Sequence, residues 1–299
     1  MSQFFKTYIR GIRYITSYVS ITLIVLSLVV LSVRGLNLGL DFTGGMVTEV
    51  TVDASLDNHQ LLNVLTPTLG EGTTVTPSGG EGRWLIRYAV GDKQETPNIS
   101  QLLSPISNQV QIVGNSMVGS QVGDDMVNQG GLALLISTLC ILGYLCFRFE
   151  WRLASGALLA LFHDVVLVLG FFAATQMEFN LTTLAAVLAI LGYSLNDSII
   201  IADRIRELLL AKRNTPTPEI NDQAVMATFS RTMVTSGTTL ITISALWLMG
   251  GNSLAGFATA MFIGVISGTW SSISIGTVLP EKCQLTAQHY LPTEVDMAP

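Results

Sequence analysis

One carboxylate lies inside a stretch of the chain that is otherwise almost wholly apolar. The stretch ILGYSLNDSIII (190–201) carries Asp197, with Tyr193 four positions and Ser194 three positions before it. Residues three and four apart share one face of a helix, so these side chains would form a polar stripe. An ionised side chain at membrane depth costs about 3 kcal/mol and typically marks an ion or substrate pathway. Asp197 is therefore our first candidate functional residue.

A second stretch carries side chains that could face this acid. RTMVTSGTTLIT (231–242) opens on Arg231 and continues with hydroxyl groups spaced three and four residues apart, on one helix face. Such a face can serve as a packing seam between helices or can line a hydrated path, and the spacing alone allows both. The residues expected to line a path are Tyr193, Ser194, Asn196, Thr232, Thr235, Ser236 and Thr239.

Asp197 and Arg231 together could form a proton site. Burial disfavours the charge of a carboxylic acid whereas a nearby guanidinium favours it, and the balance of the two allows a proton to load and unload. The alternative is a carboxylate satisfied by hydrogen bonds between helices, with no part in transport. Asp164, which follows His163 in another apolar stretch, is a second candidate for a proton relay. A lone histidine in a helix, however, is more often a hydrogen-bonded packing residue than a ligand.

The composition is that of a membrane protein. Charged residues make up 12% of the 299 and hydrophobic residues 49%, whereas soluble domains carry about 25% charged residues. The three cysteines form no disulfide or zinc pattern, and no phosphate-binding GxxxxGK loop is present. We therefore expect no metal, no cofactor, no nucleic-acid partner and no enzymatic activity.

Six stretches are long enough to cross a bilayer, which takes about 20 mostly apolar residues per helix. They are residues 14–33, 130–147, 154–175, 181–202, 228–249 and 257–279. The sequence thus predicts an α-helical polytopic membrane protein with six transmembrane helices. We divide the chain into an N-terminus with the first helix (1–34), an inserted domain (35–129), a five-helix bundle (130–280) and a tail (281–299).

The distribution of basic residues predicts the orientation. If the six spans alternate, 11 of the 15 lysine and arginine residues fall on one side of the membrane. The positive-inside rule places that side in the cytoplasm, together with both termini. The inserted domain, residues 35–129, then lies outside, in the periplasm.

The inserted domain carries both strand and helix signals. MVTEVTVD (46–53), RWLIRYAV (83–90) and NQVQIVG (108–114) are typical of strands. Asp57 is a plausible N-cap for a helix whose apolar positions include Leu61 and Leu65. Strands and helices that interleave in one short segment predict a small α+β domain.

Four separated blocks of the sequence resemble one family of bacterial membrane proteins. They are GLNLGLDFTGG (35–45), FRFEWRLA (147–154), GYSLNDSIIIADRIRE (192–207) and RTMVTSGTT (231–239). In their order, their spacing and the large insertion after the first span, the chain closely resembles the SecF family of protein-export membrane subunits. One position departs from the family pattern: Ser120, in VGSQVG (118–123), stands where the family tends to carry a proline, which relaxes a fixed backbone φ at the join between domain and membrane.

This resemblance implies a role in protein export. Members of the family are held to act as partners of SecD, in an accessory complex that joins the SecYEG channel and the SecA motor in the bacterial inner membrane. They are held to use the proton-motive force to draw the translocating polypeptide outward, and they share their membrane architecture with the resistance-nodulation-division exporters. The resemblance also implies a ferredoxin-like fold for the inserted domain, a proton-relay acid at Asp197 and its basic partner at Arg231.

The stretch LDFTGG (40–45) is expected to couple the spans to the inserted domain. Its glycines permit backbone geometries closed to other residues, and its aspartate and threonine can hydrogen-bond their neighbours. The residues of this coupling motif are Asp41, Phe42, Thr43, Gly44 and Gly45.

Three other interpretations stay open. A proton-coupled small-molecule exporter of the same superfamily would need an apolar pocket with convergent polar groups. An intramembrane aspartyl protease would need two acids poised together, and Asp164 and Asp197 could be proposed, but the glycine-flanked motif of that chemistry is absent. A purely structural subunit could hold SecD in place while protons move elsewhere.

Overall fold

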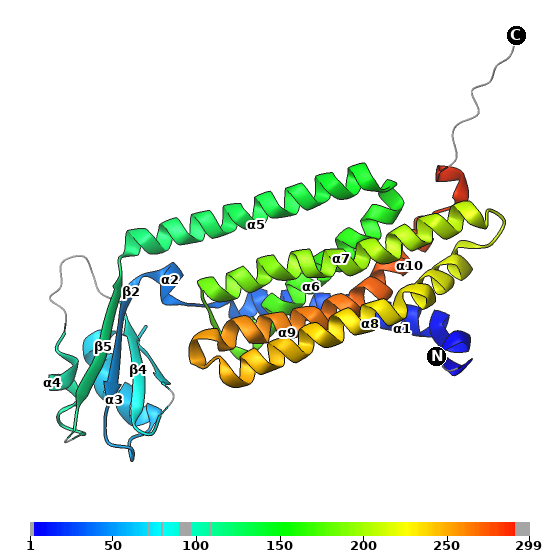
Figure 1. Cartoon of the computed structure of the whole chain (residues 1–299). Helices are drawn as coiled ribbons and strands as arrows, with labels where there is room; N and C mark the ends of the chain where they lie inside the picture. The colour runs from blue at the N-terminus through cyan, green and yellow to red at the C-terminus, as the bar shows by residue number, and fades with distance from the viewer. Residues whose placement is uncertain (1–2, 71, 79, 90–96, 108, 291–299) are drawn as a thin grey trace, which may run out of the picture.

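The computed structural model describes residues 3–70, 72–78, 80–89, 97–107 and 109–290. A small lobe that contains a sheet and a bundle of long helices lie end to end (Figure 1). The chain runs through the bundle in α1 (Gln3–Arg34), builds the lobe and returns in α5 (Ser120–Arg148). The other bundle helices are α6 (Trp151–Thr175), α7 (Leu181–Ala211), α8 (Thr217–Met249), α9 (Asn252–Ile273) and α10 (Ile275–Lys282). The start of α1 and the end of α10 lie at the end of the bundle away from the lobe.

The expectation of six membrane spans is confirmed. Six helical segments within the described residues are long and apolar enough to cross a membrane, so the chain is a multi-pass membrane protein. The helices are longer than the expected spans: α8 begins at Thr217 instead of 228, and α7 continues to Ala211 instead of 202. α5 begins at Ser120, ten residues before the expected 130, because a polar helical stretch (124–129) continues the helix beyond the apolar run. The last span is broken at Ser274 into α9 and α10, within a stretch that carries several serine and threonine residues.

The lobe has the ferredoxin-like fold that the resemblance implied. Its elements follow the order strand, helix, strand, strand, helix, strand, and the sheet is wholly antiparallel with the order β3-β4-β2-β5. These elements are β2 (Gly45–Thr51), α3 (Asn58–Leu69), β3 (Thr74–Pro77), β4 (Arg83–Tyr88), α4 (Ile99–Leu103) and β5 (Gln111–Val118). Val50, Leu61 and Ile86 are fully buried at the centre of its core.

Local signals in the lobe were correct for some elements and incomplete for others. Asp57 caps α3 with a capping box: its side chain accepts from the Gln60 amide at 2.8 Å. The strand expected at 108–114 lies further along, at 111–118, and a polar cross-strand pair between Thr48 and Asn115 (2.7 Å) continues it past the apolar residues. β3 was missed because it has four residues and buries only Val75.

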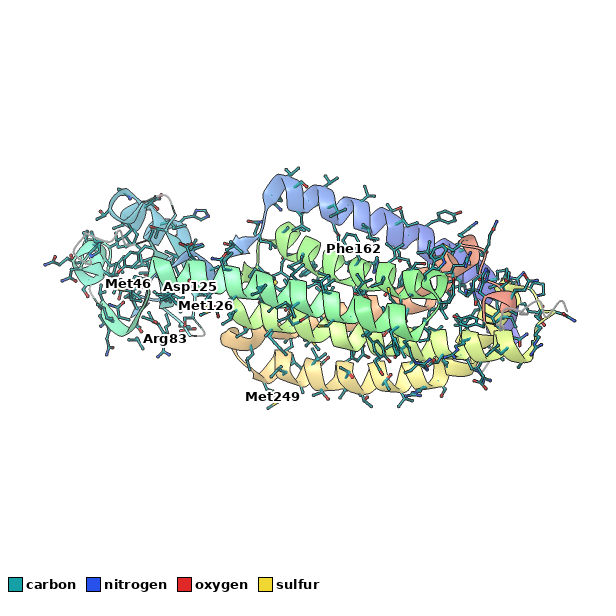
Figure 2. The ribbon with its side chains drawn as sticks, turned by 90° about the horizontal axis from the view of Figure 1, so that it is seen from above. Met46, Arg83, Asp125, Met126, Phe162 and Met249 are labelled. Atoms are coloured by element: carbon teal, nitrogen blue, oxygen red, sulfur yellow. The ribbon has the colours of Figure 1, made fainter. Side chains whose placement is uncertain are left out.

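The lobe joins the bundle through very short connections. Gly44 separates β2 from the short helix α2 (Leu40–Thr43), and Gly119 alone separates β5 from α5. Figure 2 shows Asp125 and Met126 where α5 leaves the lobe, and Met249 at the end of α8 that faces the lobe. Ser120, at the first helical position of α5, occupies a place where proline is commonly found.

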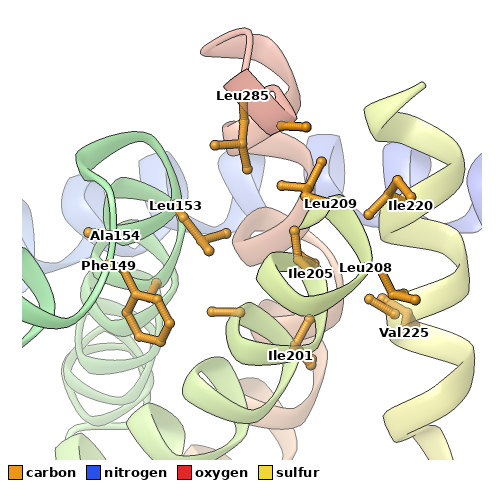
Figure 3. Packing of buried hydrophobic residues seen from close by; sticks show 14 of the residues in the cluster. Phe149, Leu153, Ala154, Ile201, Ile205, Leu208, Leu209, Ile220, Val225 and Leu285 are labelled. Atoms are coloured by element: carbon orange, nitrogen blue, oxygen red, sulfur yellow. The ribbon is translucent and has the colours of Figure 1, made fainter. Parts of the chain in front are cut away.

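At the end of the bundle away from the lobe, the helices share an apolar core (Figure 3). It contains Phe149 from the turn between α5 and α6, Leu153 from the start of α6, Ile205 from α7, Ile220 from α8 and Leu285 from the segment after α10. This core holds α6, α7 and α8 together around the polar residues described below.

Close glycine contacts set the crossing of α7 and α9. The Gly264 and Gly268 pair of the last span, a close-packing signal in membranes, lies against α7. A Cβ at Gly264 would collide with the side chain of Ile190, and one at Gly268 would lie 3.2 Å from the Ser194 Cβ. The two helices therefore approach more closely than larger residues would allow.

We expect Gly264→Ala to destabilise the bundle by about 1–3 kcal/mol, because overpacking forces neighbouring side chains and backbone to move. The matched control is Gly237→Ala on α8, where a Cβ would meet no atom within 4 Å. That substitution should be neutral, or stabilising by up to about 1 kcal/mol. Unfolding of the purified variants in detergent measures both, and equal stability of the two variants would contradict this view of the α7–α9 contact.

Candidate functional site: buried carboxylates in the helix bundle

Asp197 lies in the interior of the bundle on α7, where its side chain is 1% exposed. One of its oxygens, Oδ2, has no hydrogen-bond partner among the described residues. The neighbouring Ser198 hydroxyl and the Thr232 hydroxyl on α8 are also buried and unpaired within the described part of the chain. Arg231, which is exposed, acts on Asp197 electrostatically, and the two form no ion pair in the described part of the chain. Asp197 therefore has a basic group near it without being fixed by it.

The other expected path-lining hydroxyls of α8, besides that of Thr232, divide into two groups. Ser236 accepts a hydrogen bond from the Tyr193 hydroxyl at 3.0 Å and bonds Thr269 of α9 at 2.6 Å, so it links three helices. Thr235 and Thr239 instead donate to carbonyls of α8 itself. Hydroxyls bonded in this way serve their own helix backbone and do not by themselves make a path.

Asn196 lies apart from these groups. It is exposed on the surface of the described chain, on the face of α7 away from Ser194 and Asp197, which are both buried. The one-residue offset places it about 100° round the helix from Asp197, because an α-helix has about 3.6 residues per turn. Asn196 is thus placed to contact lipid or a partner subunit.

Asp164 is the centre of a more complete hydrogen-bonded cluster than Asp197. It is fully buried on α6, and its Oδ1 bonds His163 Nδ1 at 2.8 Å. Its Oδ2 accepts from Ser194 of α7 at 2.5 Å and from Ser271 of α9 at 2.9 Å. The other ring nitrogen of His163, Nε2, is buried and unpaired among the described residues. Three helices therefore converge on one carboxyl group.

Two of the residues in this network, Thr269 and Ser271, were not identified from the sequence. The signal was present in SGTWSSIS (267–274), which places serines at 267, 271 and 274 on one helix face. Their neighbours in this stretch carry no charge, so its serines do not stand out from an ordinary membrane span.

The coupling motif contacts the helix that carries Asp197. The Asp41 carboxylate accepts a hydrogen bond from the Leu181 amide at 2.8 Å, at the first residue of α7. The unpaired amides at a helix N-terminus carry partial positive charge, so a carboxylate there is favourable. Asn180, the N-cap residue, accepts from the Thr183 amide at 2.9 Å. The start of α7 is thus held both by its own N-cap and by the chain that leads into the lobe.

The rest of the motif packs on both sides of this joint. Phe42 is buried and stacks on Phe179 with ring centroids 6.0 Å apart. Gly44 and Gly45 have φ values of 65° and 126°, and a Cβ on Gly45 would lie 2.7 Å from the Tyr88 carbonyl oxygen. Thr43 donates to the Gly39 carbonyl. Only glycine fits this turn without strain.

Two more contacts tie the lobe to the bundle. β1 (Asn37–Leu38) pairs in parallel with β6 (Glu178–Phe179), the strand just before α7. Arg87, on β4 of the lobe, forms an ion pair with Glu178. The lobe and the start of α7 are therefore in direct contact through backbone and side chains.

We expect Asp41→Ala to cost about 1 kcal/mol of stability, the usual cost of losing a helix cap. It should also slow export more than this loss explains, because it releases α7 from the lobe. The matched control is Asp57→Ala, which removes a cap of the same kind from α3 within the lobe. Comparison of unfolding in detergent with export in cells separates the two effects; equal export by both variants would argue against coupling through Asp41.

One buried charge was not recognised from the sequence. Arg13 was treated only as a basic residue before the first span, yet it is fully buried. It forms ion pairs with Asp222 of α8 and Glu281 of α10, and its Nε donates to the Thr277 hydroxyl at 2.9 Å.

Among the described residues no group of histidine, cysteine, aspartate and glutamate side chains is placed to hold a metal ion.

Six membrane-spanning helices, carboxyl groups buried between them and an attached ferredoxin-like lobe define a polytopic membrane protein of the transporter type. Two family models match the chain: "Protein export membrane protein SecD/SecF, C-terminal" over residues 98–284 and "SecD/SecF GG Motif" over residues 29–55. The chain belongs to the SecD/SecF family of protein-export membrane proteins, as its sequence blocks indicated.

Relatives in this family are similar over nearly their whole length. The protein translocase subunit SecF of Vibrio alginolyticus is 39% identical over 282 residues, which cover 93% of this chain and 90% of the relative. That of Pseudomonas aeruginosa is 37% identical over 286 residues, covering 95% and 94%. That of Escherichia coli O157:H7 is 38% identical over 280 residues, covering 92% and 87%. These names denote a transport role and not catalysis.

Solved structures of SecDF share the fold. The crystal structure of SecDF, a translocon-associated membrane protein from Thermus thermophilus, matches with a TM-score of 0.82 and 30% identity, over 94% of this chain and 38% of the solved one. A structure of SecDF in a super-membrane-facing form matches with a TM-score of 0.69 and 31% identity, over 93% and 38%. This chain therefore spans well under half of the solved SecDF chain.

Proposed function

We propose that the chain is the SecF-type subunit of a SecD–SecF complex that uses the proton-motive force to promote protein translocation across the bacterial inner membrane. The names of its relatives and the fold shared with SecDF support this role. SecD would be the partner in this complex, because the solved structure that this chain resembles, over 38% of its length, is of SecDF. The complex would act with the SecYEG channel, the SecA motor and the translocating polypeptide, within membrane lipid.

The orientation follows the distribution of basic residues. Both termini face the cytoplasm and residues 35–129 lie in the periplasm, in agreement with the positive-inside rule. The lobe would then meet the polypeptide as it emerges. The opposite end of the bundle, where α1 starts and α10 ends, would face the cytoplasm.

The observation that carries the proton-driven role is the buried, incompletely paired carboxyl group of Asp197, beside Arg231 and on the helix that Asp41 ties to the lobe. A charge that enters or leaves a buried site changes which packing of its neighbours is favourable. Proton exchange at Asp197 would therefore shift α7 against α8, and the Asp41 contact would pass that shift to the lobe. Asp164, with its contacts to α7 and α9, would serve as a second proton station.

The test is purification of the full chain from native membranes, with identification of bound subunits, followed by reconstitution of the complex in proteoliposomes. We expect a SecD subunit to co-purify, and we expect an imposed proton gradient to increase the yield of translocated polypeptide in the presence of SecYEG and SecA. Collapse of the gradient with an ionophore should remove the increase. Absence of SecD from the purified complex would count against the assignment, and rescue of drug efflux in a deletion strain would favour the small-molecule exporter instead.

A further inference from the structure

A graded ion cluster connects the bundle interior with its end away from the lobe. Arg13 is fully buried, and the exposed fraction of its partners rises outward, from 4% for the Glu281 side chain to 15% for Asp222. Asp222 also pairs with Arg10, at 3.0 Å, whose side chain is 52% exposed. Two arginines and two carboxylates therefore form a continuous cluster that runs from the buried interior of the bundle to its surface.

Glu281 receives further hydrogen bonds from two helices. The Tyr14 hydroxyl of α1 donates to its Oε2 at 2.6 Å, and the Asn221 amide of α8 donates to its Oε1 at 2.9 Å. The same amide donates to the Thr277 carbonyl at 2.9 Å. Both oxygens of Glu281 thus accept hydrogen bonds from donors on neighbouring helices, which fix the carboxylate in one position.

A line of buried hydroxyls runs from this cluster to Asp164. Ser267 and Ser271 of α9, Ser274 at the break and Thr277 of α10 are all buried, and the buried side chain of Glu281 follows Thr277 one helical turn further on. Ser271 donates to Asp164, and Thr277 accepts from Arg13. The ten residues from Ser271 to Glu281 cover about 15 Å of helix, roughly half the thickness of the hydrocarbon core.

The break at Ser274 lies in the middle of this line. Its backbone torsion angles (φ −86°, ψ −86°) are not helical, and α9 ends there while α10 begins. The hydroxyls of Ser274 and Thr277 bond carbonyls of Trp270 and Ile273 in the broken turn, at 2.8 and 2.6 Å. Thr235 and Thr239 of α8 bond their own helix in the same way, but here the line ends on ionisable groups, since Ser271 also donates to Asp164 and Thr277 also accepts from Arg13. A hydroxyl both donates and accepts, so it can pass a proton by rotation or through a water molecule.

We propose that Glu281 and Asp222 form the cytoplasmic proton-exchange site, reached from Asp164 along this hydroxyl line. The inference rests on the proposed proton-driven function and adds the site at which the proton leaves the protein. In the transfer, the carboxylic acid of Asp164 loses a proton and becomes a carboxylate, while the carboxylate of Glu281 gains one and becomes a neutral acid. The proton then leaves to water at the exposed edge near Asp222 and Arg10, which restores the charge of the cluster.

The surrounding charges suit a site of release. Arg10, Arg13 and Tyr14 face it from α1, Asp222 from α8 and Lys282 from α10, where its Nζ lies 5.6 Å from the Tyr14 ring centroid. From α6, Arg152 donates to the Cys283 carbonyl at 3.0 Å and pairs with Glu150. The two carboxylates balance the charges of Arg10 and Arg13, so a proton that arrives leaves the cluster with excess positive charge, and its departure to the cytoplasm is favoured.

The experiment uses the purified complex in liposomes that contain a pH-sensitive dye, with an imposed proton gradient. We expect Glu281→Gln to slow proton uptake by about tenfold or more, since a positioned proton-transfer group contributes at least that much. The matched control is Glu219→Gln, the same substitution on an exposed residue at the start of α8. Glu281→Asp, which keeps the acid, should restore most of the rate. Infrared difference spectra between high and low pH should lose one carboxylic-acid band in Glu281→Gln and keep it in Glu219→Gln.

The outcomes separate this site from the proposed function. Normal uptake by Glu281→Gln, alongside loss of uptake in Asp164→Asn, would overturn the exit site and leave proton coupling in place. Normal uptake by Asp164→Asn would remove the route and the second proton station together. If both Glu281 variants fail to fold, Thr277→Val interrupts the line at the next hydroxyl; slower uptake supports the proposal and an unchanged rate overturns it.

Discussion

Replacement of Asp197 by asparagine is expected to slow proton-dependent export strongly while the protein still folds. The change keeps the size of the side chain and removes its ability to exchange a proton. We expect the proton-dependent rate to fall by about 100-fold, the lower range for loss of a positioned proton-transfer group. Because one oxygen of Asp197 has no partner among the described residues, the substitution breaks few contacts, and unfolding should change little. Export with and without an ionophore, in a strain that carries only the variant, measures the effect.

The control for this prediction is the same substitution six residues further along α7. Asp203→Asn alters an ion pair with Arg148 in which both side chains are about a third or more exposed, and exposed pairs contribute no more than about 1 kcal/mol. Export by Asp203→Asn should stay close to the unmodified level. If Asp197→Asn exported as fast as Asp203→Asn and still responded to the ionophore, Asp197 would not be the coupling group.

The second large effect is expected at Arg13. Its guanidinium is buried between Asp222 and Glu281, and Arg13→Gln would leave two carboxylates without their shared counter-charge. Removal of one partner from a buried ion pair costs about 3–5 kcal/mol, because the remaining charge is left unpaired. We expect this loss in the free energy of unfolding in detergent, with lower yield of folded protein from membranes.

Arg10→Gln is the matched control for Arg13. Arg10 bonds the same Asp222, but its side chain is about half exposed, and the expected loss is at most about 1 kcal/mol. Equal stability of the two variants would mean that the cluster contributes through water and not through a buried pair. A large loss in Arg13→Gln alone would place the cluster among the main supports of the α1, α8 and α10 contact.

The sequence identified the elements better than the contacts between them. The spans follow from apolar length, and Asp197 was identified because a charge inside such a run is conspicuous. Tyr193 and Ser194 were correctly placed on α7, yet they face different partners: Tyr193 bonds Ser236, and Ser194 bonds Asp164. Which faces meet depends on helix rotation and crossing, and a single helix does not encode either.

Arg13 and the Asp164 cluster were harder to predict for a different reason. A basic residue before a first span is ordinarily a topology signal, and nothing in the local sequence shows that α8 and α10 will enclose it. The carboxyl groups that pair with it lie more than 200 residues away along the chain. Asp164 likewise depends on Ser271, which belongs to the last span. Long-range partners of this kind emerge only when the bundle is assembled.

The short joints at both ends of the lobe have a mechanical consequence. One glycine separates β5 from α5, and a glycine turn separates α2 from β2. Few backbone bonds can therefore rotate between the lobe and the bundle. A rotation of α5 about its long axis would therefore turn the lobe with it, and the far edge of the sheet would move further than the near edge. The angle through which the helix turns, and not the length of a flexible linker, would then set how far a bound polypeptide is moved in each cycle.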